Sequence, residues 1–151
     1  MTIETSRQER VGNRPRVLVI EDFDSAREVY VRILQAGGFE VEEAASGPEG
    51  IKKALALQPE LILMDLLMTG MDGWAAARLL KADARTAYAP IVVITGAPHT
   101  DGARRAQEAG CDAYLVKPCL PQTLLKVVRD LLGAGAPAET DAGSRPGATS
   151  A

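Results

Sequence analysis

Five short apolar runs, separated by segments with helical patterns, constrain the fold more than any other feature of the chain. Short continuous runs rich in Val, Ile and Leu and bounded by turn residues are typical of strands buried on both faces. One run alternates apolar and charged residues instead, which indicates an edge strand. The runs are RVLVI (16–20), the alternating FEVEEA (39–44), ELILMD (60–65), PIVVIT (90–95) and DAYLVK (112–117).

The segments that follow these runs carry helix signals. Apolar residues recur at helical spacing in three of these segments. They are Ala26, Val29, Tyr30, Ile33 and Leu34 in the first, and Ala76, Leu79 and Leu80 on one face of the third. In the last segment we expect the helix to bury Leu124, Leu125, Val128, Leu131 and Leu132. Capping and stop residues bound the helices: Ser46 with Glu49 and Pro48, Asp72, Thr100 and Pro121 at the starts, and Gly37 and Gly110 at the ends.

Five strand–helix units with short connections predict one α/β domain, a parallel sheet covered on both faces and wound right-handedly. Such a sheet binds its ligand outside the carboxyl ends of the strands, where the strand order reverses. We expect this domain at 15–133, after a polar, flexible arm at 1–14. Residues 134–151 form a Gly/Ala/Pro-rich tail that cannot bury a core, so we expect it to be disordered.

The net charge of −3 gives no general attraction to nucleic acid or to anionic lipid. No apolar run reaches the length of a membrane span and the N-terminus lacks a signal peptide, so we expect a cytoplasmic protein. Cys111 and Cys119 flank a short strand, which would hold their sulfurs apart, so we expect both to be reduced. His99 has no histidine partner for a metal site.

Polar side chains follow four of the five predicted strands at their carboxyl ends. They are Glu21 and Asp22, Asp65, Thr95, and Lys117. If the first and third strands are neighbours, three carboxylates converge and would repel one another unless a cation compensates them. Mg²⁺ prefers oxygen ligands and binds beside phosphate, so the cluster predicts a magnesium site with Asp65 as nucleophile for a phosphoryl group. Thr95 and Lys117 could stabilise the oxygens of that group.

Four motifs, VLVIED, LILMDLLMTGMDG, PIVVITG and YLVKP, occur in order and with suitable separations. Through them residues 15–133 resemble the receiver domain of two-component response regulators. The resemblance implies a flavodoxin-like, doubly wound (βα)5 fold with strand order 2-1-3-4-5. It also implies site roles: Asp65 as phosphoacceptor; Glu21, Asp22, Asp65 and the backbone carbonyl of Leu67 as Mg²⁺ ligands; Thr95 and Lys117 as phosphoryl contacts; Thr95 and Tyr114 as switch residues; and a cis peptide bond between Lys117 and Pro118.

The resemblance implies partners as well. A sensor histidine kinase or a histidine phosphotransfer protein would donate the phosphoryl group, and a downstream protein target would read the surface formed by the fourth helix, the fifth strand and the last helix. A dimer through this face stays open. Since only the tail follows the last helix, we expect a stand-alone response regulator without an output domain and without direct DNA binding. It would be no conventional enzyme, although it would promote its own phosphorylation and the subsequent hydrolysis.

Several positions depart from the family pattern. Glu21 stands where many members have Asp, and its longer side chain would still reach a metal-bound water. Thr69 replaces a common proline, so we expect a less rigid loop after Asp65. Leu67 and Ala97 stand two residues beyond Asp65 and Thr95, and neither can orient a water molecule. These two residues predict slow self-dephosphorylation.

Other functions stay open at this point. The main alternative is a receiver-like docking module that works without phosphorylation. An aspartyl phosphatase would need a second acid where Leu67 stands, and a nucleotide or flavin site would need glycines that EDFDSA (21–26) lacks. Individually, Glu21 or Asp22 could cap a helix, Tyr114 could be an ordinary strand aromatic, and Trp74 is expected to serve packing. GARRAQ (102–107) is expected to be a solvated helix face.

Overall fold

The computed structural model describes residues 14–133, so the predicted tail and all of the predicted arm but Arg14 lie outside the described residues. A five-stranded parallel sheet forms the centre of the domain, in the order β2-β1-β3-β6-β7. Its strands are β1 (Arg16–Ile20), β2 (Glu40–Ala44), β3 (Leu61–Asp65), β6 (Ile91–Thr95) and β7 (Ala113–Val116). The predicted parallel sheet and its order 2-1-3-4-5 are therefore confirmed, and the alternating segment is an edge strand.

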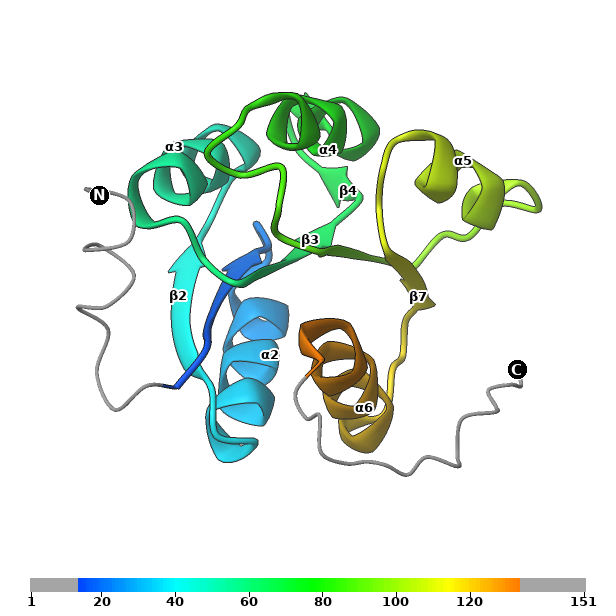
Figure 1. The fold of residues 1–151 in the computed structure, drawn as a ribbon. Helices are drawn as coiled ribbons and strands as arrows, with labels where there is room; N and C mark the ends of the chain where they lie inside the picture. The colour runs from blue at the N-terminus through cyan, green and yellow to red at the C-terminus, as the bar shows by residue number, and fades with distance from the viewer. Residues whose placement is uncertain (1–13, 134–151) are drawn as a thin grey trace.

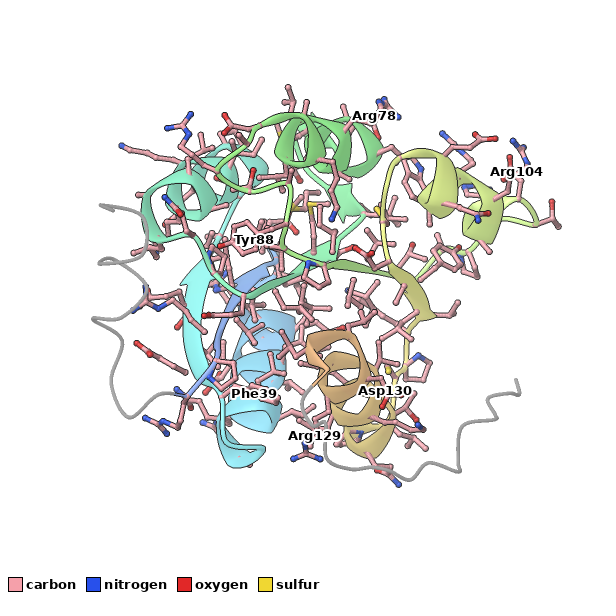
Figure 2. The ribbon with its side chains drawn as sticks, viewed as in Figure 1. Phe39, Arg78, Tyr88, Arg104, Arg129 and Asp130 are labelled. Atoms are coloured by element: carbon pink, nitrogen blue, oxygen red, sulfur yellow. The ribbon has the colours of Figure 1, made fainter. Side chains whose placement is uncertain are left out.

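Helices cover both faces of this sheet (Figure 1). On one side lie α3 (Gly47–Leu57), α4 (Gly73–Ala82) and α5 (Gly102–Glu108), and on the other lie α2 (Asp24–Ala36) and α6 (Pro121–Leu132). Two apolar clusters fill the two interfaces, one with Leu18, Met64 and Leu80, the other with Val19, Leu34 and Leu124. Arg129, labelled in Figure 2, belongs to the last turn of α6, and its guanidinium donates to the carbonyl of Gly37 just after α2 (3.2 Å).

Three of the four predicted helix starts are confirmed, including Pro121 as the first residue of α6, and one is wrong. The Ser46 hydroxyl accepts the Glu49 N–H (3.2 Å), and the Asp72 carboxylate accepts the Trp74 N–H (3.0 Å). The prediction for Thr100 is wrong, because α5 begins one residue later, after Asp101, and no side chain caps it. The exposed loop at 96–100 carries no apolar periodicity that could have fixed this boundary.

The apolar faces of two helices are narrower than their spacing suggests. Leu79 is exposed, because α4 turns only Ala76, Ala77 and Leu80 fully onto the sheet. On α6, Leu124 is buried, whereas Leu125, Leu131 and Leu132 are partly buried at the margin of the same cluster. A helix lying on a sheet buries one stripe, and residues at its margins stay half-exposed.

A short hairpin that the sequence did not predict follows β3. Its strands are β4 (Leu67–Met68) and β5 (Met71–Asp72), which pair antiparallel. Met68 is buried in the cluster under α4, and Gly47 at the start of α3 lies against the side chain of Met71. The hairpin is thus packed against two helices beside the carboxyl ends of the strands. Within 14–133, no helix has the length and apolar character needed to span a membrane.

Candidate functional site

Three carboxylates meet at the carboxyl ends of β1 and β3, at the point where the strand order reverses. Ile20 pairs with Met64 in the sheet register, which brings the residues that follow them, Glu21 and Asp65, side by side. One oxygen from each of Glu21, Asp22 and Asp65 lies within 4.8 Å of the others. Glu21 and Asp65 are almost fully buried (1% and 4% exposed). Neither Glu21 nor Asp22 is the N-cap of α2, which is Phe23, so the capping alternative is excluded.

Lys117 reaches this cluster from the end of β7. Its ammonium group donates to Asp65 Oδ2 (3.0 Å) and to Glu21 Oε1 (3.2 Å). The Lys117–Pro118 peptide bond is cis, and the Lys117 N–H donates to the carbonyl of Thr95 (2.8 Å). Lys117 thus makes hydrogen bonds to residues at the ends of three other strands.

Charge repulsion and burial leave a clear mark on the cluster. Burial, aided by contact with the Asp65 carboxyl, raises the pKa of Glu21 from 4.5 to about 7. Burial alone would lower the pKa of Lys117, but its hydrogen bond to Asp65 and the two nearby carboxylates outweigh burial and raise it. Glu21 therefore holds its proton more readily than an ordinary glutamate, mainly because it is buried.

Backbone N–H groups hold the carboxylates in place. The N–H of Leu67 donates to Asp65 Oδ1 (2.9 Å), and the N–H of Phe23 donates to Glu21 Oε2 (3.1 Å). The N–H of Thr69, in the hairpin turn, donates to Asp22 Oδ2 (3.0 Å) and lowers the pKa of Asp22. Each acid therefore keeps a fixed orientation.

The group of residues suits a hard divalent cation. Oxygens on opposite sides of a bound Mg²⁺ lie about 4 Å apart, close to the spacing of the three carboxylates. Burial raises the pKa of Glu21, and a nearby cation would favour its ionised form. Both Glu21 oxygens already accept hydrogen bonds, so Glu21 suits contact through a metal-bound water.

Thr95 and Tyr114 line one cavity of about 210 Å³. Thr95 is buried at the end of β6, and its hydroxyl accepts the N–H of Ala97 (3.1 Å). The Tyr114 ring stacks on Trp74, with ring centroids 6.5 Å apart and planes inclined by 16°. The guanidinium carbon of Arg105 lies 5.4 Å from the centroid of the Trp74 ring. Arg105 belongs to the segment 102–107, which was expected to be a solvated helix face.

Two residues near the site were not singled out by the sequence. Tyr30 of α2 lies beneath Lys117, with the ammonium group 5.9 Å from the ring centroid. Arg27 donates to the backbone carbonyl of Glu21 (2.9 Å) and to the carboxylate of Glu43 (3.0 Å). Tyr30 was assigned only to an apolar helix face, and no pattern pairs a helix residue with a lysine 87 positions later.

The fold and this pocket define a doubly wound α/β protein with an acidic site at the topological switch point. Residues 17–129 match the response regulator receiver domain. The chain therefore belongs to the family of response regulator receiver domains.

Curated relatives of two kinds match the chain. The DNA-binding dual master transcriptional regulator RpaA of Synechocystis is 33% identical over 118 residues, which cover 78% of this chain and 49% of the relative. The chain thus spans about half the length of the first curated relatives that it matches. Protein PilH of Pseudomonas aeruginosa is 30% identical over 117 residues, which cover 78% of this chain and 97% of PilH.

Solved structures of receiver proteins show the same fold. The chemotaxis protein CheY4 of Vibrio cholerae has a TM-score of 0.74 and 30% identity, covering 78% of this chain and 98% of CheY4. The receiver domain of the sensor histidine kinase PA1611 of Pseudomonas aeruginosa has a TM-score of 0.73 and 25% identity, covering 80% of this chain and 98% of that receiver domain. That structure holds a magnesium ion coordinated in its active-site cleft.

Proposed function

We propose that the protein is a response regulator that accepts a phosphoryl group on Asp65 in a Mg²⁺-dependent reaction. The donor is a phosphohistidine of a sensor histidine kinase or of a histidine phosphotransfer protein. The observation that carries this proposal is the convergence of three carboxylates and Lys117 on one point at the carboxyl edge of the sheet. The magnesium ion in the related PA1611 receiver domain supports it.

The residues present divide the chemistry among themselves. Asp22, Asp65 and the Leu67 carbonyl would hold Mg²⁺, with Glu21 contacting it through water. When bound, the ion neutralises charge on the cluster and on the phosphoryl oxygens. A carboxylate oxygen of Asp65 forms the new bond to phosphorus, while the P–N bond to the donor histidine breaks and its electron pair stays on the imidazole nitrogen. Lys117 stabilises the charge on the transferred group.

A change of surface would carry the signal onward. The Thr95 hydroxyl turns toward the phosphoryl group and leaves the Ala97 N–H. The cavity between Thr95 and Tyr114 gives the ring space to move inward. Tyr114 then loosens from Trp74 and remodels the face formed by α5, β7 and α6, where a downstream protein would bind.

Apolar side chains beside the pocket support contact with a partner protein. Phe23, Leu67 and Leu120 follow the ends of β1, β3 and β7, and each is more than half exposed. Large exposed apolar residues are typical of protein-binding surfaces. A donor protein docked there would bring its phosphohistidine to Asp65.

Phosphorylation with acetyl phosphate tests the proposal directly. The protein is incubated with Mg²⁺ and acetyl phosphate, and its intact mass is measured. We expect one added phosphoryl group on the wild type and on Asp130→Asn, an exposed carboxylate on α6, but none on Asp65→Asn. We also expect none when EDTA replaces Mg²⁺. A wild type that gains no phosphoryl group would favour the phosphorylation-independent docking module instead.

A further inference from the structure

The turn of the β4–β5 hairpin has a defined backbone geometry. Met68 pairs with Met71, so Thr69 and Gly70 are the two central residues of the turn. Gly70 has φ +82°, whereas Thr69 is not among the residues with positive φ. This combination matches a type II turn, whose first central position favours proline and whose second favours glycine. Proline at position 69 would therefore fit the backbone.

A threonine at this position supplies a hydrogen-bond donor that proline lacks. The Thr69 N–H donates to Asp22 Oδ2 (3.0 Å) across 47 residues of sequence. The turn that presents this N–H is fixed from both sides, by buried Met68 and by the contact between Met71 and Gly47. Packing of the hairpin against α3 and α4 therefore fixes the position of the Thr69 N–H.

We propose that the backbone N–H of Thr69 positions Asp22 for divalent-cation binding, so that residue 69 sets the cation affinity of the pocket. The inference rests on the proposed function, since it assigns Asp22 to the Mg²⁺ site. Thr69 is a positioning residue, because it acts through the Asp22 carboxylate.

The hydrogen bond from Thr69 holds the Asp22 carboxylate in the orientation that brings it close to Glu21 and Asp65. With Asp22 Oδ2 bonded to Thr69, an oxygen of Asp22 lies within 4.8 Å of oxygens from Glu21 and Asp65. Asp22 is the least buried of the three acids, and side-chain freedom would otherwise let it rotate away. Partners that orient metal-binding carboxylates change metal affinity about 10- to 100-fold when they are removed.

Two substitutions at one position separate the N–H from the side chain. Thr69→Pro removes the N–H, and Thr69→Ala removes the hydroxyl but keeps the N–H. Mg²⁺ is titrated into each protein, with binding followed by Trp74 fluorescence and by calorimetry. The backbone N–H is the largest influence of Thr69 on Asp22, and the hydroxyl adds a smaller one. We therefore expect Thr69→Ala to bind Mg²⁺ only about two- to threefold more weakly than the wild type, and Thr69→Pro at least about tenfold more weakly. In urea unfolding without Mg²⁺, we expect Thr69→Pro to be no less stable than the wild type, since proline suits the turn.

A second measurement does not depend on the proline variant. In the wild type without Mg²⁺, we expect the Thr69 amide hydrogen to exchange more slowly than in Asp22→Ala, which lacks the acceptor. In the Asp22→Ala background, Thr69→Pro and Thr69→Ala should bind Mg²⁺ equally.

The outcomes distinguish this inference from the proposed function. If the wild type does not bind Mg²⁺, the proposed function itself fails. If the wild type binds Mg²⁺ and Thr69→Pro binds as tightly or more tightly, the role of Thr69 is refuted while the function stands. Equal losses in Thr69→Pro and Thr69→Ala, or equal amide exchange with and without the Asp22 carboxylate, would refute it as well.

Discussion

The contact between Gly102 and Tyr114 provides a sharp test of how the region beside the pocket is packed. Gly102 is the buried first residue of α5, and the hydroxyl end of Tyr114 lies directly against it. A Cβ at position 102 would fall well inside van der Waals contact with the Tyr114 hydroxyl and Cζ. In Gly102→Ala, the ring must move by roughly 1 Å to restore ordinary contact distances.

The expected magnitude follows from two opposing effects. Overpacking of this kind costs about 1–3 kcal/mol, and a displaced Tyr114 ring also gives up part of its stacking on Trp74. Replacing glycine by alanine in a helix returns at most about 1 kcal/mol. We expect Gly102→Ala to lower the free energy of unfolding by about 1–2 kcal/mol. In a Tyr114→Ala background the clash is absent, so the same change should be neutral or slightly stabilising.

Urea unfolding followed by circular dichroism measures all four proteins of this double-mutant cycle. We expect a coupling energy between positions 102 and 114 of at least about 1 kcal/mol. Gly96→Ala is the matched control, because its Cβ would make only an ordinary contact with Lys117, and it should lose no stability. An equal effect of Gly102→Ala with and without the Tyr114 ring would refute the reasoning.

Three further predictions concern the pocket and the cysteines. Burial raises the pKa of the Cys111 thiol to about 11, so at pH 8 iodoacetamide should label the less buried Cys119 first. Peptide mass spectrometry should show that labelling of Cys111 accelerates about tenfold per pH unit up to about pH 10. Equal labelling of the two cysteines at pH 8 would contradict this. Free Mg²⁺ at 100 times its dissociation constant should raise the free energy of unfolding of the wild type by about 2.7 kcal/mol in urea titrations, and an unchanged value would count against the cation site. Exposed Leu67 and Ala97 carry no group that can orient water, so a Leu67→Asn, Ala97→Glu variant phosphorylated by acetyl phosphate should lose its phosphoryl group at least about tenfold faster than the wild type, and an equal rate would oppose this explanation.

The sheet was predictable because its signal is local and repeated. The short apolar run around Leu63 favours a strand buried on both faces, and alternation around Val41 indicates an edge strand. The grouping of Glu21, Asp22 and Asp65 also followed, because parallel strands present their carboxyl ends at one edge. These inferences needed only strand periodicity and one topological rule.

The parts that the sequence could not predict depend on tertiary contacts. The sequence marked Thr69 as a departure from a common proline, but nothing local indicates that its N–H meets Asp22. Likewise, Tyr30 lies under Lys117 because α2 and β7 are brought together only by the completed sheet. At Thr100, a residue well suited to capping precedes a helix that starts without it, because local preference is weak when packing decides the boundary.

The bridging position of Lys117 has a consequence for biosynthesis. The hydrogen bonds from Lys117 to Asp65 and Glu21 span 52 and 96 residues. The Lys117 ammonium group is therefore made after both carboxylates that it contacts. A nascent chain that has emerged only as far as β6 contains Glu21 and Asp65 but not Lys117. Burying two carboxylates without a positive partner costs free energy. Until the residues that follow β7 have been made, the chain lacks the ammonium group that bridges Glu21 and Asp65 in the finished domain.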